Sequence, residues 1–256
     1  MGKREGHRER EGDWVYGIIP VEHALKASRR KVLALWVQMG ITNERVRQLV
    51  SRAGGIPVRT ASQGEMDKLT SGGVHQGIAA EVEPFPWETM EGIMEGRGPL
   101  VFLEGIEDPR NLGAIIRSSV ATGAGRIILE KRRRARLSGA VAKAACGALE
   151  YVRLSSVPNL PRAMRLAKER GYWLVGTTDR GGAPLWEADL PEKVGVVIGG
   201  EGRGLREVVK RECDFWVTIP AEGPIGTYNA SVAASIVLYE LMRRRAEEKL
   251  GRKEGS

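Results

Sequence analysis

Short apolar runs alternate with longer amphipathic stretches over the second half of the chain, from residue 99 onward. The runs are PLVFLEGI, RIILEK, YVRLSSV, YWLVGTTD, KVGVVIGG and DFWVTIP, and helical segments lie between them. A strand that is apolar along its whole length is typical of a parallel sheet with helices on both faces. The pattern therefore predicts an α/β domain with a parallel sheet over residues 99–247.

The last segment of this domain, VAASIVLYELMRRR, predicts a long helix that begins after Asn229. An Asn or Ser at the start of a helix is typical of an N-cap, so either Asn229 or Ser231 is expected to have that role. The apolar residues Val232, Ile236, Val237 and Leu241 recur at helical spacing. We therefore expect this face of the helix to pack inward.

The first half of the chain has a second and smaller alternation over residues 14–83. VEHALKAS, TNERVRQLVSRAGG and QGEMDKLTS predict helices, whereas KVLALWVQ, IPVRTAS and GIAAEVE predict strands. This length is sufficient for a separate small α/β domain. Prolines and glycines interrupt the pattern over residues 84–98, which predicts a linker with one helical turn in its middle.

The two ends of the chain are charged. Residues 1–13 lack an apolar core, so they are no signal peptide and predict a disordered tail, and residues 248–256 predict a charged tail. No apolar run approaches the roughly 18 to 20 residues that span a bilayer, so we expect a cytoplasmic protein without a membrane partner. The 2 cysteines and 3 histidines have no metal-ligand spacing, which argues against a disulfide scaffold and a metal site.

The charge balance favours a polyanionic partner. The chain has 40 Lys and Arg against 32 Asp and Glu, a net charge of +8. A basic surface gains affinity for nucleic acid by releasing counterions, and the run KRRRAR over residues 131–136 concentrates this charge. Arg132, Arg133 and Arg134 are therefore candidates for contacts with an RNA backbone, although charge runs are often only solvated faces.

Three junctions between a strand and the following helix carry unusual residues, and the first is FLEGIEDPRNLGAIIRSS. Asp108 and Pro109 form a good helix start, which is a purely structural explanation for them. They do not explain Arg117, which lies six residues beyond Asn111 on a helix whose other residues are mostly small and apolar. An amide and a guanidinium fork suit a phosphate and its neighbouring ribose.

The second junction is VVIGGEGRGLRE, where a buried strand runs into four glycines and Glu201. Some of these glycines are explained by a tight turn, but four together indicate close approach of a ligand to the backbone. The loop also matches the glycine pattern of Rossmann-type methyltransferases. In those folds, however, the glycine loop follows the first strand, whereas here only one more strand and helix remain.

The third junction is VTIPAEGPIGTYNAS, in which Ile219 and Pro220 end a strand and glycines and polar residues lead into the last helix. A plain N-cap needs one polar residue, and this stretch has several. In a parallel sheet, ligands bind where strands end and helices begin. The surplus indicates backbone that is left bare for a ligand.

Together the three junctions resemble the signature motifs of the SpoU/TrmH branch of the SPOUT RNA methyltransferases. The first motif of that family contains an Asn and an Arg, the second a Gly-x-Glu-x-x-Gly-Leu, and the third an Ile-Pro followed by a polar pair. The matching residues are Asp108, Pro109, Asn111, Gly113, Arg117, Gly199, Glu201, Gly204, Leu205, Ile219, Pro220, Asn229 and Ser231. The motifs keep their order over most of the second domain.

The resemblance implies a trefoil-knotted methyltransferase domain that forms a homodimer. The first domain resembles the family's substrate-binding domain, which is similar to ribosomal protein L30e, in VYGIIPVEHAL and GVHQGIAAE. His75 and Gln76 lie in the second of these stretches. They are candidates for RNA contacts, and a turn-stabilising role explains them equally well.

The implied activity is S-adenosylmethionine-dependent methylation of a ribose 2′-hydroxyl in structured RNA, and the subgroup it resembles most acts on a guanosine of 23S rRNA. The implied cofactor-binding residues are Thr177, Gly199, Gly200, Ile219, Pro220, Thr227, Tyr228 and Asn229. The implied catalytic residues are Arg117, Asn111, Glu201 and Asn229. Arg117 is either the general base or a clamp for the phosphate beside the acceptor ribose.

One departure from the family affects the cofactor pocket. The family commonly has Ser-Leu-Asn where this chain has Thr227, Tyr228 and Asn229. Threonine retains the hydroxyl group. Tyrosine is bulkier than leucine, so we expect a reshaped adenine pocket.

Three other functions compete with this interpretation. A tRNA 2′-O-methyltransferase would carry the same motifs, so the sequence leaves rRNA and tRNA open as substrates. A catalytically inactive RNA-binding protein would have lost motif residues, yet all of them are present. A nucleotide-dependent oxidoreductase needs a phosphate-binding glycine loop after its first strand, and this chain has none there.

Overall fold

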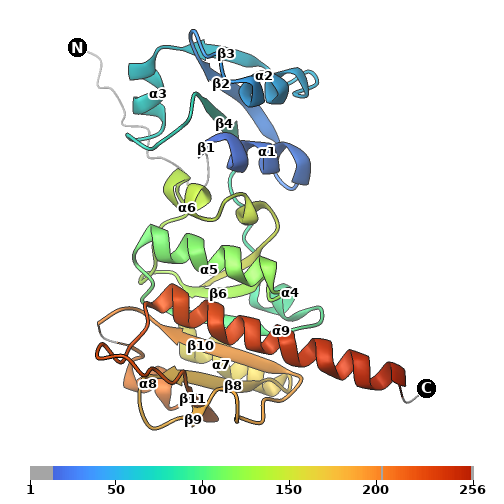
Figure 1. The fold of residues 1–256 in the computed structure, drawn as a ribbon, viewed down its shortest axis with the longest axis vertical. Coiled ribbons are helices and arrows are strands. Elements are labelled where there is room, and N and C mark those ends of the chain that lie inside the picture. Colours follow the sequence, from blue (N-terminus) through green and yellow to red (C-terminus); the bar gives the residue numbers. More distant parts are fainter. Residues whose placement is uncertain (1–13, 203, 255–256) are drawn as a thin grey trace. The chain divides into compact units, whose positions relative to one another are not determined.

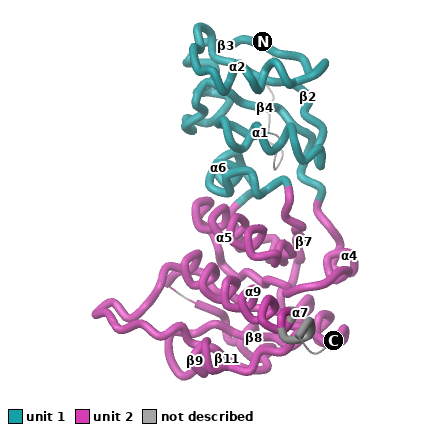
Figure 2. The backbone as a smooth tube through the Cα atoms, turned by 45° about the vertical axis from the view of Figure 1, so that its right-hand side comes forward, with its two compact units in different colours: residues 1–86, 136–150 teal, residues 87–135, 151–256 magenta. Residues whose placement is uncertain are grey.

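A computed structural model of the chain describes residues 14–202 and 204–254 (Figure 1). The tail expected over residues 1–13 lies outside the described residues. The chain divides into two compact units, drawn in different colours in Figure 2. The smaller unit contains residues up to 86 together with 136–150, and the larger unit contains residues 87–135 and 151 onward.

The smaller unit is built around a four-stranded mixed sheet in the order β1-β4-β2-β3. Strand β4 is antiparallel to both of its neighbours, and β2 and β3 are parallel. Its elements are β1 (Trp14–Tyr16), α1 (Ile18–Ala27), β2 (Val32–Gln38), α2 (Glu44–Ser51), β3 (Val58–Ala61), α3 (Gln63–Leu69) and β4 (Ile78–Val82). All the helices and strands predicted here are present, and β1 is an additional short strand.

Polar caps explain where the helices of this unit begin. Asn43 accepts a hydrogen bond from the backbone of Arg45 at the start of α2. Ser62 and Glu65 form a reciprocal capping box at the start of α3. Each cap satisfies backbone N–H groups that have no partner inside the helix.

Residues 136–150 complete the smaller unit. They form α6 (Gly139–Ala144) and the short 3-10 helix η1 (Ala148–Glu150). Arg30, which lies in the bend after α1, forms a fully buried ion pair with Glu150 of η1. The sequence pattern assigned this segment to the second domain, whereas its contacts group it with the first.

The larger unit contains a seven-stranded sheet in the order β7-β6-β5-β10-β8-β11-β9, and each neighbouring pair is parallel. Its elements are α4 (Met90–Met94), β5 (Leu100–Glu104), α5 (Pro109–Ala121), β6 (Arg126–Glu130), β7 (Arg153–Val157), α7 (Leu160–Glu169), β8 (Trp173–Thr178), β9 (Ala183–Pro184), β10 (Val194–Gly199), α8 (Glu207–Lys210), β11 (Phe215–Thr218) and α9 (Ala230–Glu254). The predicted α/β class with a parallel sheet is confirmed.

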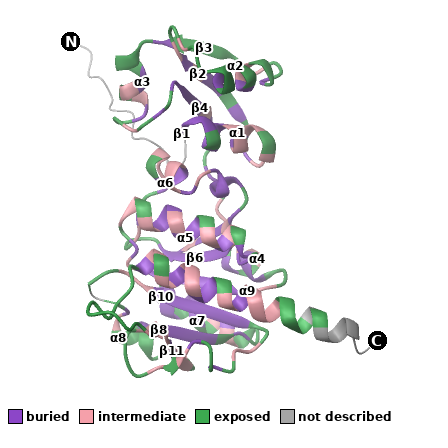
Figure 3. Ribbon diagram, viewed as in Figure 1, coloured by how far each residue is buried: buried purple, intermediate pink, exposed green. Residues whose placement is uncertain are grey.

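The core of the larger unit lies along this sheet. Every residue of β5 and β6 is buried. Figure 3 shows strands of this sheet drawn largely in purple, the colour of buried residues. One cluster joins Phe102 and Val197 of the sheet to Leu160 and Met164 of α7. Helices α5 and α9 pack against each other (Figure 1). Burial on both faces explains why the central residues of these strands are apolar.

Helix α9 packs inward over a narrower face than its sequence predicts. Val237 and Leu241 are buried and Ile236 is half-buried, but Val232 is 45% exposed. The expectation that Val232 packs inward is therefore wrong. Val232 lies two positions from both Ala230 and Ala234, which are buried, and two residues along a helix rotate by about 200°, to the opposite side. The helix continues to Glu254, through part of the expected charged tail.

Two arginines hold the segment over residues 84–98 to the larger unit. Arg153 forms an ion pair with Glu88, 2.6 Å between Nη2 and Oε2. The buried guanidinium of Arg126 donates to the carbonyls of Ile93, Met94 and Gly96 at 3.2 to 3.3 Å. The helical turn expected in the middle of this segment is α4. No helix in the described part of the chain has the length and apolar character needed to cross a bilayer.

Candidate functional site

The three predicted loops leave the sheet at the same edge. Strands β5 and β10 are in register, so that Gly199 lies opposite Glu104 at their carboxyl ends. Strand β8 pairs with both β10 and β11, and Thr177 lies opposite Val217. The carboxyl ends of parallel strands form one crevice, so residues far apart in the sequence meet there.

Three side chains, one from each loop, are joined by hydrogen bonds at this edge. Asn111 on the first turn of α5 donates from Nδ2 to Oε1 of Glu201 at 3.0 Å. Asn229 donates to the same carboxylate oxygen and, at 3.2 Å, to Oδ1 of Asn111. The structure therefore brings together three of the four residues predicted to be catalytic.

The orientation of the Asn229 amide follows from its second role. Its Oδ1 accepts from the backbone N–H of Ser231 at 2.9 Å and from the Ser231 hydroxyl at 2.6 Å. A backbone N–H only donates, so the oxygen of the amide faces Ser231 and its NH₂ group faces Glu201. Asn229 is thus the N-cap of α9, and its remaining donor group fastens the third loop to the second.

The glycines of the second loop have structural explanations. A Cβ on Gly200 would meet the carbonyl oxygen of Gly105 at 2.0 Å, and one on Gly199 would meet the backbone of Gly204 at 2.7 Å. Gly202 and Gly204 have φ values of 82° and 58°, a region that favours glycine. Close packing of protein backbone is sufficient to explain Gly199 and Gly200, and the backbone conformation is sufficient to explain Gly202 and Gly204. The glycines alone are therefore no evidence for a ligand.

The third loop is different, because its backbone is bare. Residues 221–229 are all exposed. Nothing lies within 4 Å of the position that a Cβ would take on Gly223 or Gly226. The hydroxyl group of Tyr228 donates to the carbonyl oxygen of Pro220 at 3.1 Å, which closes the loop upon itself.

Two further predicted residues of the site lie on α5 and β8, and Ile219, which follows β11, is half-buried. Arg117 is exposed and lies six residues beyond Asn111 on α5, about 9 Å along the helix axis. Thr177 is half-buried, and its hydroxyl donates to the carbonyl oxygen of Val197 at 3.2 Å. That bond ties β8 to β10 immediately before the second loop begins.

Sequence reasoning missed a charged cluster at the same edge. Glu104 ends β5 and Glu130 ends β6, and both are buried. Arg206, which follows the second loop, forms ion pairs with both carboxylates. Burial alone lowers the pKa of Arg206, but hydrogen bonds to Glu104 and Glu130 outweigh it and raise the pKa. An acidic residue that ends a fully apolar strand was the available signal.

The predicted RNA contacts of the smaller unit are engaged within it. His75 is 5% exposed, accepts from the backbone N–H of Gly77 through Nδ1 at 3.0 Å, and lies 3.2 Å from Asp67 through Nε2. The side-chain oxygen of Gln76 accepts from the backbone N–H of Ile18 at 3.2 Å. These contacts favour the turn-stabilising alternative, and RNA binding by this pair stays a prediction.

The predicted basic run is divided by its surroundings. Arg132 and Arg133 are exposed. Arg134 is half-buried: its guanidinium lies 4.5 Å from the ring centre of Trp87 and donates to the carbonyl of Ala135 at 3.0 Å. Of the three candidate arginines, Arg132 and Arg133 are therefore the exposed ones.

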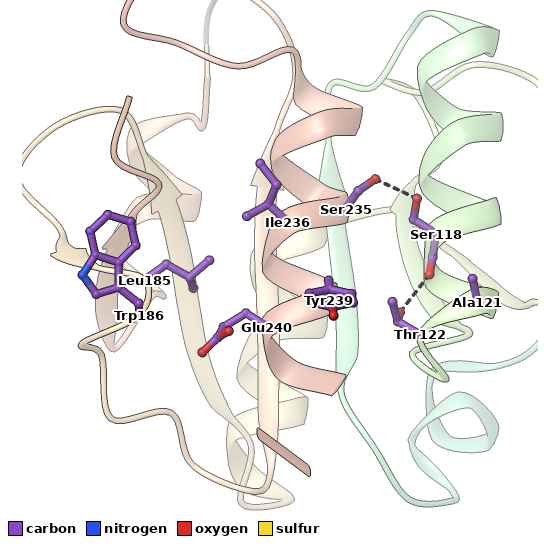
Figure 4. A pocket seen from close by; sticks show the side chains of 9 residues that line it. All are labelled: Ser118, Ala121, Thr122, Leu185, Trp186, Ser235, Ile236, Tyr239 and Glu240. Carbon is purple, nitrogen blue, oxygen red and sulfur yellow. Dashed lines mark hydrogen bonds between the residues drawn. The ribbon is translucent and has the colours of Figure 1, made fainter. Parts of the chain in front are cut away.

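An open cavity of about 480 Å³ lies on the surface formed by α5, α9 and the segment after β9 (Figure 4). Its lining residues are Ser118, Ala121, Thr122, Leu185, Trp186, Ser235, Ile236, Tyr239 and Glu240. The hydroxyls of Ser118 and Ser235 lie 2.7 Å apart and join the two helices. Tyr239 and Trp186 are 58% and 61% exposed, so large aromatic rings face solvent here.

Comparison with known proteins agrees with this geometry. The profile of the SpoU rRNA Methylase family matches residues 98–239, and the profile for RNA 2′-O ribose methyltransferase substrate binding matches residues 14–87. The chain therefore belongs to the SpoU rRNA methylase family. The resemblance inferred from the three motifs is confirmed, and the protein is an S-adenosylmethionine-dependent RNA methyltransferase.

Individual relatives and solved structures resemble the chain over nearly its whole length. The 23S rRNA (guanosine-2′-O-)-methyltransferase RlmB of Pseudomonas aeruginosa is 37% identical over 239 residues, which are 90% of this chain and 96% of that protein. The SpoU methyltransferase AviRb from Streptomyces viridochromogenes superposes with a TM-score of 0.79 at 25% identity, covering 92% of this chain and 90% of AviRb. An AdoMet-bound rRNA methyltransferase from Sinorhizobium meliloti has a TM-score of 0.76 at 25% identity, covering 90% and 87%.

Proposed function

We propose that this protein transfers the methyl group of S-adenosylmethionine to the 2′-hydroxyl of a guanosine in 23S rRNA. The observation that carries the proposal is the junction at Glu201, where amides of Asn111 and Asn229 meet on one carboxylate. Relatives such as the Pseudomonas aeruginosa enzyme are named for this substrate and match nearly the whole chain. Ribosomal RNA as substrate also implies action in the cytoplasm.

The third loop supplies the features that a cofactor site needs. Exposed backbone over residues 221–229 offers N–H and C=O groups to an adenine edge, and the glycines leave space in front of them. When bound, S-adenosylmethionine supplies an activated methyl group on a sulfonium. The residues that would hold it are Thr177, Gly199, Gly200, Ile219, Pro220, Thr227, Tyr228 and Asn229. The hydroxyl group of Thr177 already donates to the carbonyl oxygen of Val197, so this hydroxyl could only accept a hydrogen bond from the cofactor.

Arg117 is the proposed contact with the acceptor strand. A guanidinium offers donors in a fixed fork and holds its proton throughout the physiological range, so it suits a phosphate better than it suits proton abstraction. Arg117 would bind the phosphate beside the acceptor ribose, and the 2′-hydroxyl proton would leave to water. The Asn111–Glu201–Asn229 junction would keep the loops fixed, so that acceptor oxygen and methyl group are aligned.

Arg132 and Arg133 are proposed to bind the RNA backbone. Both are exposed, and each phosphate contact adds to the salt dependence of binding. A 2′-hydroxyl exists only in RNA, so a DNA strand of the same sequence should accept no methyl group.

We also infer the finer features of the fold. The return of the third loop to Asn111 and Glu201 before α9 packs on α5 supports a trefoil knot in the larger unit. The family match over residues 14–87 and the small mixed sheet support an L30e-like substrate domain. The exposed aromatic rings beside the α5–α9 cavity support a homodimer formed through this face.

The test is to incubate the purified protein with methyl-labelled S-adenosylmethionine and total RNA from a strain that lacks the enzyme. Mapping the labelled ribose is expected to identify one guanosine in 23S rRNA. Label in tRNA would instead support the alternative substrate. Heat on calorimetric titration with the cofactor, but no label in any RNA, would contradict the proposed activity.

A further inference from the structure

A three-residue ionic cluster lies directly behind the second loop. Glu104 and Glu130 end neighbouring parallel strands, with side chains 3% and 9% exposed. Arg206 donates from Nη2 to Oε2 of Glu130 at 2.8 Å. Its side-chain Nε donates to Oε1 of Glu104, and its backbone N–H donates to Oε2 of Glu104 at 2.8 Å. Two buried carboxylates would be costly alone, and one guanidinium with an added N–H offsets that cost.

The loop is anchored at both of its ends beside this cluster. At the start, Gly199 is in register with Glu104 on the paired strands, and Gly200 packs against the backbone of Gly105. At the end, Arg206 returns to the side chain of the same Glu104. The N–H of Gly204 donates to the carbonyl of Gly200 at 3.2 Å, so the loop is narrow between its anchors.

Glu201 is carried on this narrow loop. It is exposed and belongs to no strand or helix itself. Its reach to Asn111, at 3.0 Å, therefore depends on where the loop is fixed. A displacement of about 1 Å at a reacting centre is sufficient to reduce turnover about 100-fold.

We propose that Arg206 is a positioning residue, which uses Glu104 and Glu130 to hold Glu201 in reach of Asn111 and Asn229. The inference rests on the proposed function, because it assigns a purpose to the Glu201 junction in methyl transfer. It goes further, because Glu104, Glu130 and Arg206 are not among the residues that match the family's motifs, although Glu104 and Arg206 lie within the first and second junctions.

The test compares Arg206→Gln and Arg206→Lys with the intact protein. Lysine keeps a positive charge beside the buried carboxylates but has no fork, so it cannot reach both at once. We expect kcat to fall about 10- to 100-fold in both variants, with the KM for S-adenosylmethionine and RNA changed less than about threefold. Hydrogen exchange of backbone amides over residues 199–202 should become faster in both. The matched control is Arg165→Gln, which removes an exposed arginine paired with Glu212 and should retain full kcat.

A second pair of variants keeps the test independent of folding. Glu130→Ala removes the acceptor of Nη2, whereas Glu130→Gln retains an oxygen there. We expect Glu130→Gln to recover most of the kcat that Glu130→Ala loses. The inference would be overturned if the Arg206 variants fold, have the kcat of the intact protein and show equally slow hydrogen exchange over residues 199–202. Absence of methylation by the intact protein would instead count against the proposed function, and the exchange measurement would still decide the role of Arg206.

Discussion

The carboxylate of Glu201 accepts hydrogen bonds from two asparagine amides, and these amides come from two other loops. Asn229 also caps α9, so a single side chain fixes both the start of the last helix and the position of the third loop. At the scale of single residues, each of these three side chains forms hydrogen bonds with more than one partner, and these bonds fix the positions of the loops that carry the partners.

Arg117→Ala is expected to reduce turnover at least about 100-fold, since it removes the proposed donor fork beside the acceptor. The rate of label transfer to RNA measures this effect. Arg110→Ala is the matched control: Arg110 is an exposed arginine on the same helix that forms an ion pair with its neighbour Asp108. The hydrogen bond to Asp108 raises the pKa of Arg110 most, and the charge of Glu201 has the smallest effect on it. Normal methylation by Arg117→Ala would refute both roles considered for this residue.

Tyr228→Phe is expected to raise the KM for S-adenosylmethionine between about twofold and tenfold. The change removes the hydroxyl that donates to Pro220, and a hydrogen bond of this kind is worth about 0.5 to 1.5 kcal/mol. The loop would then be less well fixed for the cofactor. Calorimetric titration of the variant would check the result, and an unchanged affinity would exclude the tyrosine from loop positioning.

Elements, rather than single residues, explain how the smaller unit is assembled. Helix α6 and the turn η1 lie between β6 and β7 in the sequence, yet they pack with β1 and α1. Gly139 is required there, because a Cβ would meet the ring of Tyr16 at 2.2 Å. The buried pair of Arg30 and Glu150 ties the same elements together.

Breaking this pair is expected to destabilise the protein strongly. Arg30→Met leaves the Glu150 carboxylate buried without its partner, which costs about 3 to 5 kcal/mol. Urea unfolding monitored by circular dichroism measures the loss. The double variant Arg30→Met with Glu150→Leu removes both charges and should recover much of the stability. Equal stability of the single variant and the intact protein would contradict the assignment.

An ion-pair network on helix α9 is expected to make the free energy of unfolding depend on pH. Hydrogen bonds from Arg243 and Arg244 lower the pKa of Glu240 from 4.5 to about 2. The folded state therefore favours the ionised carboxylate, so this contribution is present above pH 4.5 and is lost as the pH falls toward 2. Glu240→Gln should flatten the dependence of unfolding free energy on pH in that interval. An identical acid profile in the variant would show that the carboxylate contributes nothing.

At the scale of the whole molecule, the α5–α9 face is proposed to bind a second copy of the chain. Tyr239→Asp places a charge among aromatic and aliphatic side chains, so it should shift the protein from dimer to monomer in sedimentation. Far-ultraviolet circular dichroism confirms that the variant is folded. A monomeric intact protein, or a dimer unaffected by the charge, would contradict the proposed interface.

The sequence predicted the larger sheet well and the contacts between distant residues poorly. The six predicted strands of this unit were recognisable by their short apolar runs, whereas β9 has only 2 residues and no pattern. The three loops were identified by their surplus of glycine and polar residues. Arg206 and Glu104 are 102 positions apart, and nothing in the local pattern indicates that they meet.

The interleaved make-up of the smaller unit bears on how such a protein is engineered or recombined. Its parts come from two separate stretches of the chain, residues up to 86 and residues 136–150. A chimaera that replaces only the first stretch with a foreign module would leave Glu150 without Arg30, its buried ion-pair partner. Grafting a new specificity onto this scaffold therefore requires both stretches to be transplanted together.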